Sequence, residues 1–254
     1  MTSVKPLAVQ LFSVRQDMTD DPTETLRRLA AIGYGAVEPT MGLLQADPAR
    51  FRATLDGLGL SVCSLHAPAL GAMRDEIAVA AAAIGTDAVI VPSVPAGEFT
   101  DGAGVARVAR QLRDAAAWAA DNGLRLGYHN HHWELSQRVA GQPALELLAD
   151  LLPAEVFLEV DVYWAAVGGA DVVALLHRLG DRVRYLHVKD GPATVDDPMT
   201  AVGGGTLPIV DILRAGPPDA WHVVELDRCA TDMMGALADS HAYLTEAAAA
   251  GAPR

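Results

Sequence analysis

The sequence predicts a single (β/α)₈ TIM barrel that spans residues 1–254. Three observations lead to this prediction. The length of 254 residues is typical of such barrels, and 51% hydrophobic residues are enough for a large core. In addition, short apolar runs alternate with helical stretches from one end of the chain to the other. Strict alternation of this kind favours a parallel sheet that is covered by helices.

Eight runs have the length and the apolar character of buried strands. These runs are LAVQL (7–11), GAVEP (35–39), SVCSLH (61–66), DAVIVP (87–92), LRLGYHNH (124–131), VFLEVD (156–161), VRYLHV (183–188) and WHVVEL (221–226). Other stretches place apolar residues three and four positions apart and often stop at Gly or Pro, which predicts helices. They are residues 22–33, 50–60, 104–123, 143–151, 171–180, 208–215 and 232–250.

A doubly wound open sheet is the alternative fold for the same alternation of strands and helices. The dinucleotide-binding members of that class carry a glycine-rich loop directly after the first strand. Here the segment VQLFSVRQDM (9–18) contains no glycine. The closed barrel is therefore the preferred arrangement.

Composition and charge restrict the class of partner. The chain has 19 basic and 32 acidic residues, a net charge of −13, which disfavours binding to a nucleic-acid backbone. No run approaches the roughly 18 apolar residues that span a bilayer, and the N-terminus does not read as a signal peptide. Cys63 and Cys229 are expected to be buried free thiols in a reducing compartment. We therefore predict a cytoplasmic protein with a small-molecule partner, no nucleic acid and no membrane.

Polar side chains stand at the ends of seven of the eight predicted strands, and only the strand that ends in VIVPS lacks one. The residues are Gln10, Glu38, His66, His129 with His131, Glu159 with Asp161, His187 with Lys189, and Glu225 with Asp227. Any one of them could simply cap the next helix. In a barrel, however, all the strands end at one mouth, where active sites lie. Side chains two positions apart on a strand also share a face.

A divalent cation would explain why so many charged groups converge. Inward-facing charges without partners cost several kcal/mol each in lost hydration, and a bound cation removes that penalty. The mixture of imidazole and carboxylate groups suits Mn²⁺, Zn²⁺, Co²⁺ or Fe²⁺ better than Ca²⁺. Mg²⁺ is also compatible if substrate oxygens and water complete its shell. We expect one divalent ion, with Mn²⁺ as the first choice.

Eight segments in this order resemble the sugar phosphate isomerase/epimerase group of xylose isomerase-like barrels. The resemblance extends from about Ala8 to Leu244. The segments are VQLFSVRQDM, GYGAVEP, SLHAP, GYHNHHWEL, EVDVYWAAVGG, RYLHVKD, VGGGTLPIVDIL and VVELDR.

This resemblance implies that Asp161, His187 and Glu225 bind the metal. Many relatives take a fourth ligand from a glutamate at the end of the fifth strand, where this sequence has His129, which is either a ligand or a base. Where several relatives carry a histidine, this chain has Trp164, which either packs over a sugar face or lines the wall. The activity implied is isomerisation or epimerisation of a small ketose or keto-sugar. The proton next to the carbonyl is removed, and the metal stabilises the resulting enediolate.

The remaining strand-end residues receive roles around that chemistry. Glu225, His129 and His131 are the candidates for proton transfer, and Gln10, Glu38 and His66 are expected to bind substrate hydroxyls. Lys189 either holds a carboxylate or phosphate or pairs with Asp190, and pairing is favoured. The glycine-rich turn VGGGTLP (202–208) either binds phosphate or permits a close approach to the metal loop. Because the turn carries no Lys or Arg, we expect a non-phosphorylated sugar or cyclitol.

Three alternative functions remain open. A metal-dependent lyase or dehydratase acting on a keto-sugar or inosose is the second choice, because His129 disturbs a symmetric pair of glutamates. An endonuclease-like activity is disfavoured by the acidic charge and the single apparent site. A barrel that binds sugar without turnover, or a partner-dependent subunit, is the last. The resemblance also suggests a homodimer.

Overall fold

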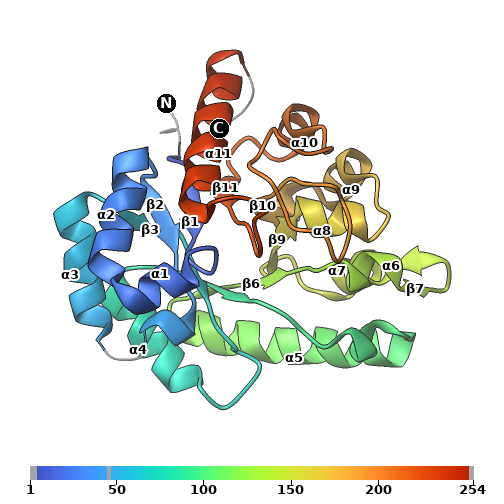
Figure 1. Ribbon diagram of the computed structural model, residues 1–254. Helices are drawn as coiled ribbons and strands as arrows, with labels where there is room; N and C mark the ends of the chain where they lie inside the picture. Colours follow the sequence, from blue (N-terminus) through green and yellow to red (C-terminus); the bar gives the residue numbers. More distant parts are fainter. Residues whose placement is uncertain (1–4, 45–46, 252–254) are drawn as a thin grey trace.

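The computed structural model of the protein describes residues 5–44 and 47–251. Nine parallel strands form one curved sheet, and helices cover its outer side (Figure 1). In chain order the strands are β1 (Ala8–Gln10), β2 (Ala36–Glu38), β3 (Ser61–Val62), β4 (Leu65–His66), β5 (Ala88–Val91), β6 (Arg125–His129), β9 (Phe157–Asp161), β10 (Val183–Val188) and β11 (Trp221–Val224).

The sheet closes on itself because β3 and β4 share one strand position. The order of pairing runs β3-β2-β1-β11-β10-β9-β6-β5-β4, so these two short strands lie at its two ends. Across the break, the backbone N–H of Cys63 donates to Val37, and that of His66 donates to Pro39 at 3.0 Å. Eight strand positions therefore form a nearly continuous barrel. The predicted TIM barrel is confirmed, and the open sheet is excluded.

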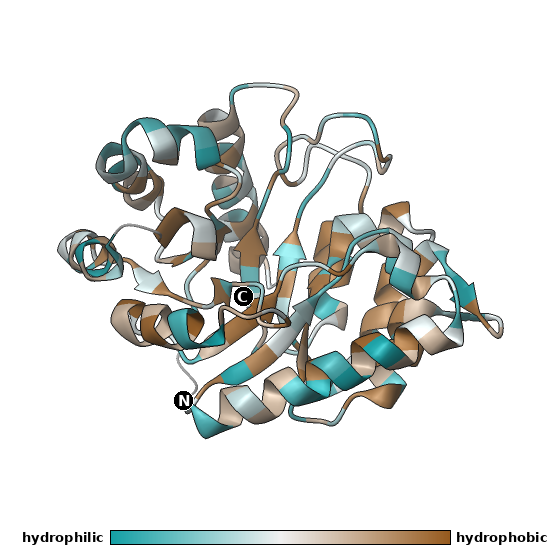
Figure 2. Cartoon of the chain, turned by 90° about the horizontal axis from the view of Figure 1, so that it is seen from below, coloured by the Kyte–Doolittle hydropathy of each residue, from teal (hydrophilic) through white to brown (hydrophobic). Residues whose placement is uncertain are grey.

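Alternate residues of each strand point into the barrel, where they form a small apolar layer. Phe157 and Tyr185 stack there with ring centroids 5.3 Å apart, among several alanines and Val223. Gly127 faces the same space, and an added Cβ would lie 2.2 Å from the Phe157 ring. Residues of the opposite face pack against the helices as the main core. Figure 2 shows the strands largely in hydrophobic colours, whereas hydrophilic and hydrophobic residues alternate along the surrounding helices.

All seven predicted helices are present. They are α2 (Pro22–Ile32), α3 (Pro48–Leu58), α5 (Gly102–Asp121), α7 (Ala144–Leu151), α9 (Val172–Leu179), α10 (Ile209–Ala215) and α11 (Met233–Ala249). Aspartates fix several of their starts: the Asp21 side chain accepts from the backbone N–H of Glu24 at 3.0 Å, and Asp171 does the same for Ala174. Such caps satisfy N–H groups that have no partner within the helix.

The structure adds several elements that were not among the predicted ones. These are α1 (Arg15–Asp20), α4 (Arg74–Ile84), α6 (Trp133–Ser136), α8 (Val162–Val167), the hairpin β7 (Arg138–Val139) and β8 (Gln142–Pro143), and the 3₁₀ turns η1 (Met41–Leu44), η2 (Ala96–Phe99) and η3 (Gly180–Arg182). Most are too short to show a helical period. Helix α4 is full length, but its alanine run gives little contrast between an apolar and a polar face.

Both cysteines are free thiols. Cys63 is buried as expected, whereas Cys229 is only half-buried in the loop after β11. None of the helices within residues 5–44 and 47–251 is both long and apolar enough to cross a membrane. The predicted domain limits of 1–254 stay a prediction, because both chain ends lie outside the described residues.

Candidate active site

Inside the barrel, a layer of polar side chains lies on top of the apolar layer, on the side where the strands end. The register of the parallel strands places Gln10 beside Glu38, and His129 beside Glu159. His187 is likewise paired with Asp161. Because all the strands run in one direction, these positions meet at the carboxyl end of the barrel. The structure therefore confirms that these strand-end side chains lie close together, as the sequence predicted; it does not test their roles.

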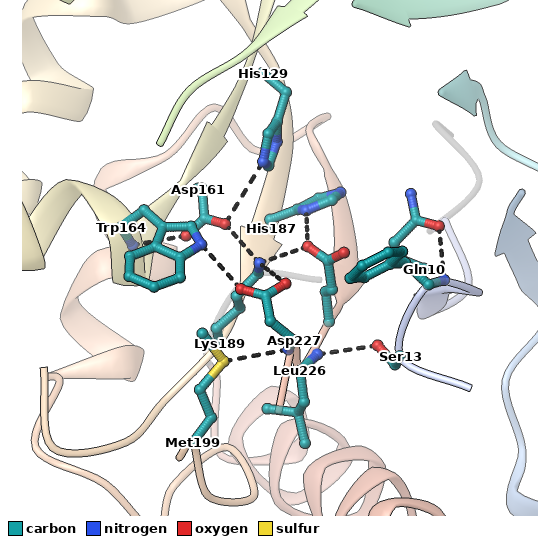
Figure 3. A network of polar contacts seen from close by, with 12 residues as sticks. Gln10, Ser13, His129, Asp161, Trp164, His187, Lys189, Met199, Leu226 and Asp227 are labelled. Carbon is teal, nitrogen blue, oxygen red and sulfur yellow. Dashed lines mark hydrogen bonds and ion pairs between the residues drawn. The ribbon is translucent and has the colours of Figure 1, made fainter. Parts of the chain in front are cut away.

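One group in this layer has the composition of a metal site. His129, Asp161, His187 and Glu225 come from β6, β9, β10 and the residue that follows β11. Each offers one donor atom, and these four atoms all lie within 4.8 Å of one another. All four residues are buried. His187 Nδ1 lies 2.8 Å from Glu225 Oε2, and His129 Nε2 lies 3.7 Å from Asp161 Oδ2 (Figure 3).

Below this group lies a set of carboxylates that hold the other nitrogens of the two imidazoles. His187 Nε2 lies 2.8 Å from Glu38 Oε1, and His129 Nδ1 lies 3.1 Å from Glu159 Oε2. Partners of this kind orient imidazole ligands and fix their tautomers. A second metal-compatible group, His66 with His129, Glu159 and His187, is formed here. The two groups share both histidines, so they are alternatives for one ion rather than independent sites.

Gln10 and Glu38 lie beneath the substrate pocket instead of in its wall. Both are completely buried, and the Gln10 amide donates to Glu38 Oε1 at 2.8 Å. The hydroxyl of Ser64 also donates to Glu38. Their polar atoms are thus engaged with neighbours, which argues against the expected role of both residues in binding substrate hydroxyls. We assign Glu38 instead to positioning His187.

Lys189 does not pair with Asp190, so that part of the sequence-based prediction is wrong. The Lys189 ammonium lies 2.9 Å from Asp161, 2.6 Å from Glu225 and 3.0 Å from Asp227. It is buried, with 1% of its surface exposed. The alternation of β10 continues past its last residue, so Lys189 points into the barrel and Asp190 points out.

Asp190 holds the glycine-rich turn. Its carboxylate accepts backbone N–H groups from Gly191 at 2.8 Å, Gly203 at 3.0 Å, and Gly205 and Leu207 at 3.1 Å. A Cβ at Gly205 would lie 2.1 Å from Asp190 Oδ1, which explains why this position needs glycine. The N–H groups that a phosphate would need are already occupied. The glycines thus allow the backbone of the turn to approach the Asp190 carboxylate closely, and the structure gives no support to phosphate binding by this turn.

A pocket of about 340 Å³ opens directly above the metal-compatible group. Its walls are Phe12, Thr40, His66, Pro92, Ser93, His129, His131, Lys189, Glu225 and Asp227. His131 lies just beyond the end of β6, stacked on Trp133 with ring centroids 4.2 Å apart. Trp164 is not among these wall residues. Its indole N–H donates to Asp227 at 3.0 Å and so supports the wall from behind.

Burial and mutual charge shift the pKa values of the cluster in opposite directions. Burial alone would lower the pKa of His187, but Glu159, Glu225 and Glu38 raise it well above its usual value. Burial alone would raise the pKa of Glu225, but Lys189 and His187 lower it well below its usual value. Burial lowers the pKa of His131 to about 3. At neutral pH, therefore, Glu225 is ionised and His131 is neutral.

The residues present fit a divalent metal ion. Asp161 Oδ1 accepts the backbone N–H of Trp164 at 2.8 Å, which caps α8, so Oδ2 is the atom that points to the centre. Among the described residues, this buried Oδ2 has no hydrogen-bond partner, and the Lys189 ammonium at 2.9 Å is the nearest positive charge to it. Burial raises the pKa of Asp161 to about 6, against the opposing effect of Lys189. Two imidazoles and two carboxylates around such an atom are ordinary ligands of transition-metal ions.

Sequence reasoning missed the group that supports His131. Glu134 is completely buried; it accepts the Tyr128 hydroxyl at 2.6 Å and the backbone N–H of His131 at 2.9 Å. A glutamate three residues after a histidine, at the start of a short helix, is the sequence signal that could have indicated this contact. Phe12 was also missed; it lies in the turn that follows β1 and lines the pocket.

The fold and this cluster define a class of protein: a parallel (β/α)₈ barrel with a potential metal centre at the carboxyl end of its strands. The profile of the xylose isomerase-like TIM barrel family matches residues 26–215. The chain belongs to this family. The resemblance inferred from the sequence is therefore confirmed.

Individual relatives are more distant. A segment of 79 residues is 38% identical to the inosose dehydratase of Geobacillus kaustophilus (strain HTA426); it makes up 31% of this chain but only 25% of that protein. A sugar phosphate isomerase/epimerase from Parabacteroides distasonis ATCC 8503 superposes with a TM-score of 0.78 at 22% identity, over 96% of this chain and 94% of that one.

A xylose isomerase-like TIM barrel protein from Mycobacterium smegmatis, in complex with magnesium, superposes with a TM-score of 0.68. The sequence identity is 14%, and the superposition covers 95% of this chain and 96% of that one. At these identities the two solved structures establish the fold of this chain alone.

Proposed function

We propose that this protein is a divalent-metal-dependent isomerase or epimerase of a small, uncharged ketose, keto-sugar or keto-cyclitol. The observation that carries the proposal is the group His129, Asp161, His187 and Glu225, whose donor atoms lie within 4.8 Å of one another at the floor of a pocket of about 340 Å³. A cytoplasmic location and a homodimer stay predictions.

His129, Asp161, His187 and Glu225 would hold the ion. Mn²⁺ is the first choice from the mixed imidazole and carboxylate donors, with Zn²⁺, Co²⁺, Fe²⁺ and Mg²⁺ as alternatives. The magnesium bound to the Mycobacterium smegmatis protein supports a divalent ion in general. When bound, such an ion would polarise the substrate carbonyl and make the adjacent C–H group more acidic.

Glu225 is the first candidate for the base that removes this proton. It lines the pocket, and its low pKa keeps it ionised. His131 is the second proton-transfer group, because it lines the same pocket as a neutral imidazole and its Nδ1 has no hydrogen-bond partner among the described residues. A proton removed by one group and returned by the other, on the opposite face, gives an epimer. Return to the neighbouring carbon gives an isomer.

The charges in the pocket favour an uncharged substrate. Among the wall residues that the structure describes, Lys189 is the one with a permanent positive charge, and three carboxylates already surround that ammonium. The N–H groups of the glycine-rich turn are held by Asp190. In this arrangement of side chains, a phosphate or carboxylate would therefore enter beside acidic groups, and no unpaired basic side chain among the described wall residues would receive it. Of the three residues assigned to substrate hydroxyls from the sequence, His66 lies in the wall and is proposed to bind a hydroxyl.

The test is deuterium exchange at the carbon next to the carbonyl. Metal-loaded protein is incubated in D₂O with ketoses, keto-sugars and inososes, and the products are analysed by NMR. We expect deuterium in both substrate and product, with loss of exchange in Glu225→Gln. Glu155→Gln is the matched control, because Glu155 is exposed at the other end of the barrel. If no compound exchanges faster with the metal-loaded protein than without it, the proposal is wrong.

A metal-dependent dehydratase is the second candidate. The local match to an inosose dehydratase favours it, as does His129 at a strand end where a symmetric epimerase would need a second glutamate. Elimination begins with the same proton removal, but a β-hydroxyl leaves as water. The product would then lose 18 mass units and gain ultraviolet absorbance, whereas an isomer keeps the mass of its substrate.

A further inference from the structure

The Lys189 ammonium sits among the very carboxylates that the proposed metal needs. It lies 2.9 Å from Asp161 Oδ2 and 2.6 Å from Glu225 Oε2 (Figure 3). Both oxygens belong to residues of the metal-compatible group. A third carboxylate, Asp227, lies 3.0 Å from the ammonium on the side of the pocket and is 24% exposed. Lys189 thus lies between the candidate metal ligands and the substrate pocket.

Asp161 offers no alternative oxygen to the metal. Its Oδ1 is engaged as the cap of α8, and Lys189 is next to the remaining Oδ2. Glu225 Oε2 is shared between Lys189 and His187 Nδ1. A divalent ion bound to these atoms would be close to the ammonium, and like charges at such a distance in a buried site repel strongly.

Asp227 provides a second place for the ammonium. It is already in contact with Lys189, and the indole N–H of Trp164 holds its other oxygen at 3.0 Å. Lysine suits a movable charge because its ammonium is compact and stands on a flexible four-carbon stem. The rest of the chain uses arginine almost throughout: of 19 basic residues, only Lys5 and Lys189 are lysines.

We propose that Lys189 is a resident cation that occupies the metal-binding carboxylates in the metal-free protein, and that metal binding displaces its ammonium toward Asp227 and into the substrate pocket. This inference rests on the proposed function, because it takes the same four residues as metal ligands. Two consequences follow. Lys189 weakens metal binding, and it neutralises Asp161 and Glu225 while no metal is bound. The displaced ammonium then becomes a hydrogen-bond donor to a substrate oxygen, so that metal binds before substrate.

Metal affinity tests the competition. Isothermal titration with Mn²⁺ and with Mg²⁺ is performed on the wild-type protein, Lys189→Met and Lys189→Arg. Lys189→Met removes the competing charge and should bind metal at least about tenfold more tightly, whereas Lys189→Arg should show no gain. Lys5→Met is the matched control, because Lys5 lines a pocket at the other end of the barrel; its metal affinity should equal that of the wild-type protein. Equal or weaker binding by Lys189→Met would overturn the proposal.

Nuclear magnetic resonance of ¹⁵N-lysine-labelled wild-type protein tests the displacement directly and does not depend on a variant that folds. Only two side chains carry the label, and Lys5 serves as the internal reference. Saturation with Mg²⁺ should shift the Lys189 side-chain resonance and leave that of Lys5 in place. An unmoved Lys189 signal at saturation would refute the displacement while the metal site itself stands. If the wild-type protein and both Lys189 variants bind no metal, the proposed function fails as well.

Discussion

Replacement of Asp190 by asparagine should strongly destabilise the protein, although the residue touches no substrate. The Asp190 carboxylate accepts four backbone N–H groups: Oδ1 serves Gly191 and Leu207, and Oδ2 serves Gly203 and Gly205. In Asp190→Asn one oxygen becomes an NH₂ group, which faces two N–H donors. Hydrogen bonds to a charged group contribute about 1.5–3 kcal/mol each. Two lost and two weakened bonds therefore predict a loss of about 3–5 kcal/mol in the free energy of unfolding.

Urea denaturation followed by circular dichroism measures this loss. Asp196→Asn is the matched control, because it removes one carboxylate from the same loop at an exposed position; its effect should stay within about 0.5 kcal/mol. A loss below about 1 kcal/mol for Asp190→Asn would refute the assignment of Asp190 as the residue that holds the glycine-rich turn. It would also restore phosphate binding as an explanation of the glycines.

Two further predictions concern buried groups. Burial raises the pKa of Glu134 from 4.5 to about 7, so the contribution of this group to the free energy of unfolding should fall as the pH rises from 5 to 8. Glu134→Gln removes this loss and should gain roughly 2–3 kcal/mol relative to wild type over that range, measured by urea denaturation at each pH; a difference that is independent of pH would contradict the assignment. Gly127→Ala would place a Cβ 2.2 Å from the Phe157 ring and should lower the free energy of unfolding by about 1–3 kcal/mol, whereas Gly57→Ala, with open space around it, should be neutral or stabilising. Equal thermal stability of these two variants would show that the apolar layer of the barrel is not tightly packed.

The fold was predictable because its pattern is local. Each strand is a short apolar run, and each of the seven predicted helices has apolar residues three and four positions apart. The break at Cys63 and Ser64, which divides one predicted strand into β3 and β4, was not visible in the sequence. Helix α4 was missed because an alanine-rich segment shows little difference between its buried and exposed faces.

The sequence predicted which residues would come together in the site, but not which of them would contact one another or line the substrate pocket. Alternation along parallel strands indicated that the strand-end polar side chains would meet at one mouth. The family resemblance then singled out Asp161, His187 and Glu225, with His129 as a fourth candidate. Neither indicated which polar layer would touch the substrate, and Gln10 and Glu38 proved to lie one layer too deep. The pairing of Lys189 was also misjudged, because adjacent residues of a strand point to opposite faces, and this rule separates Lys189 from Asp190.

The proposed function requires one divalent ion bound among four residues at the ends of four strands. Anomalous diffraction from crystals grown with Mn²⁺ would locate this ion. We predict a single anomalous peak enclosed by His129, Asp161, His187 and Glu225, and its disappearance in Asp161→Asn. A peak placed lower, among His66, His129, Glu159 and His187, or no peak at either position, would contradict the account.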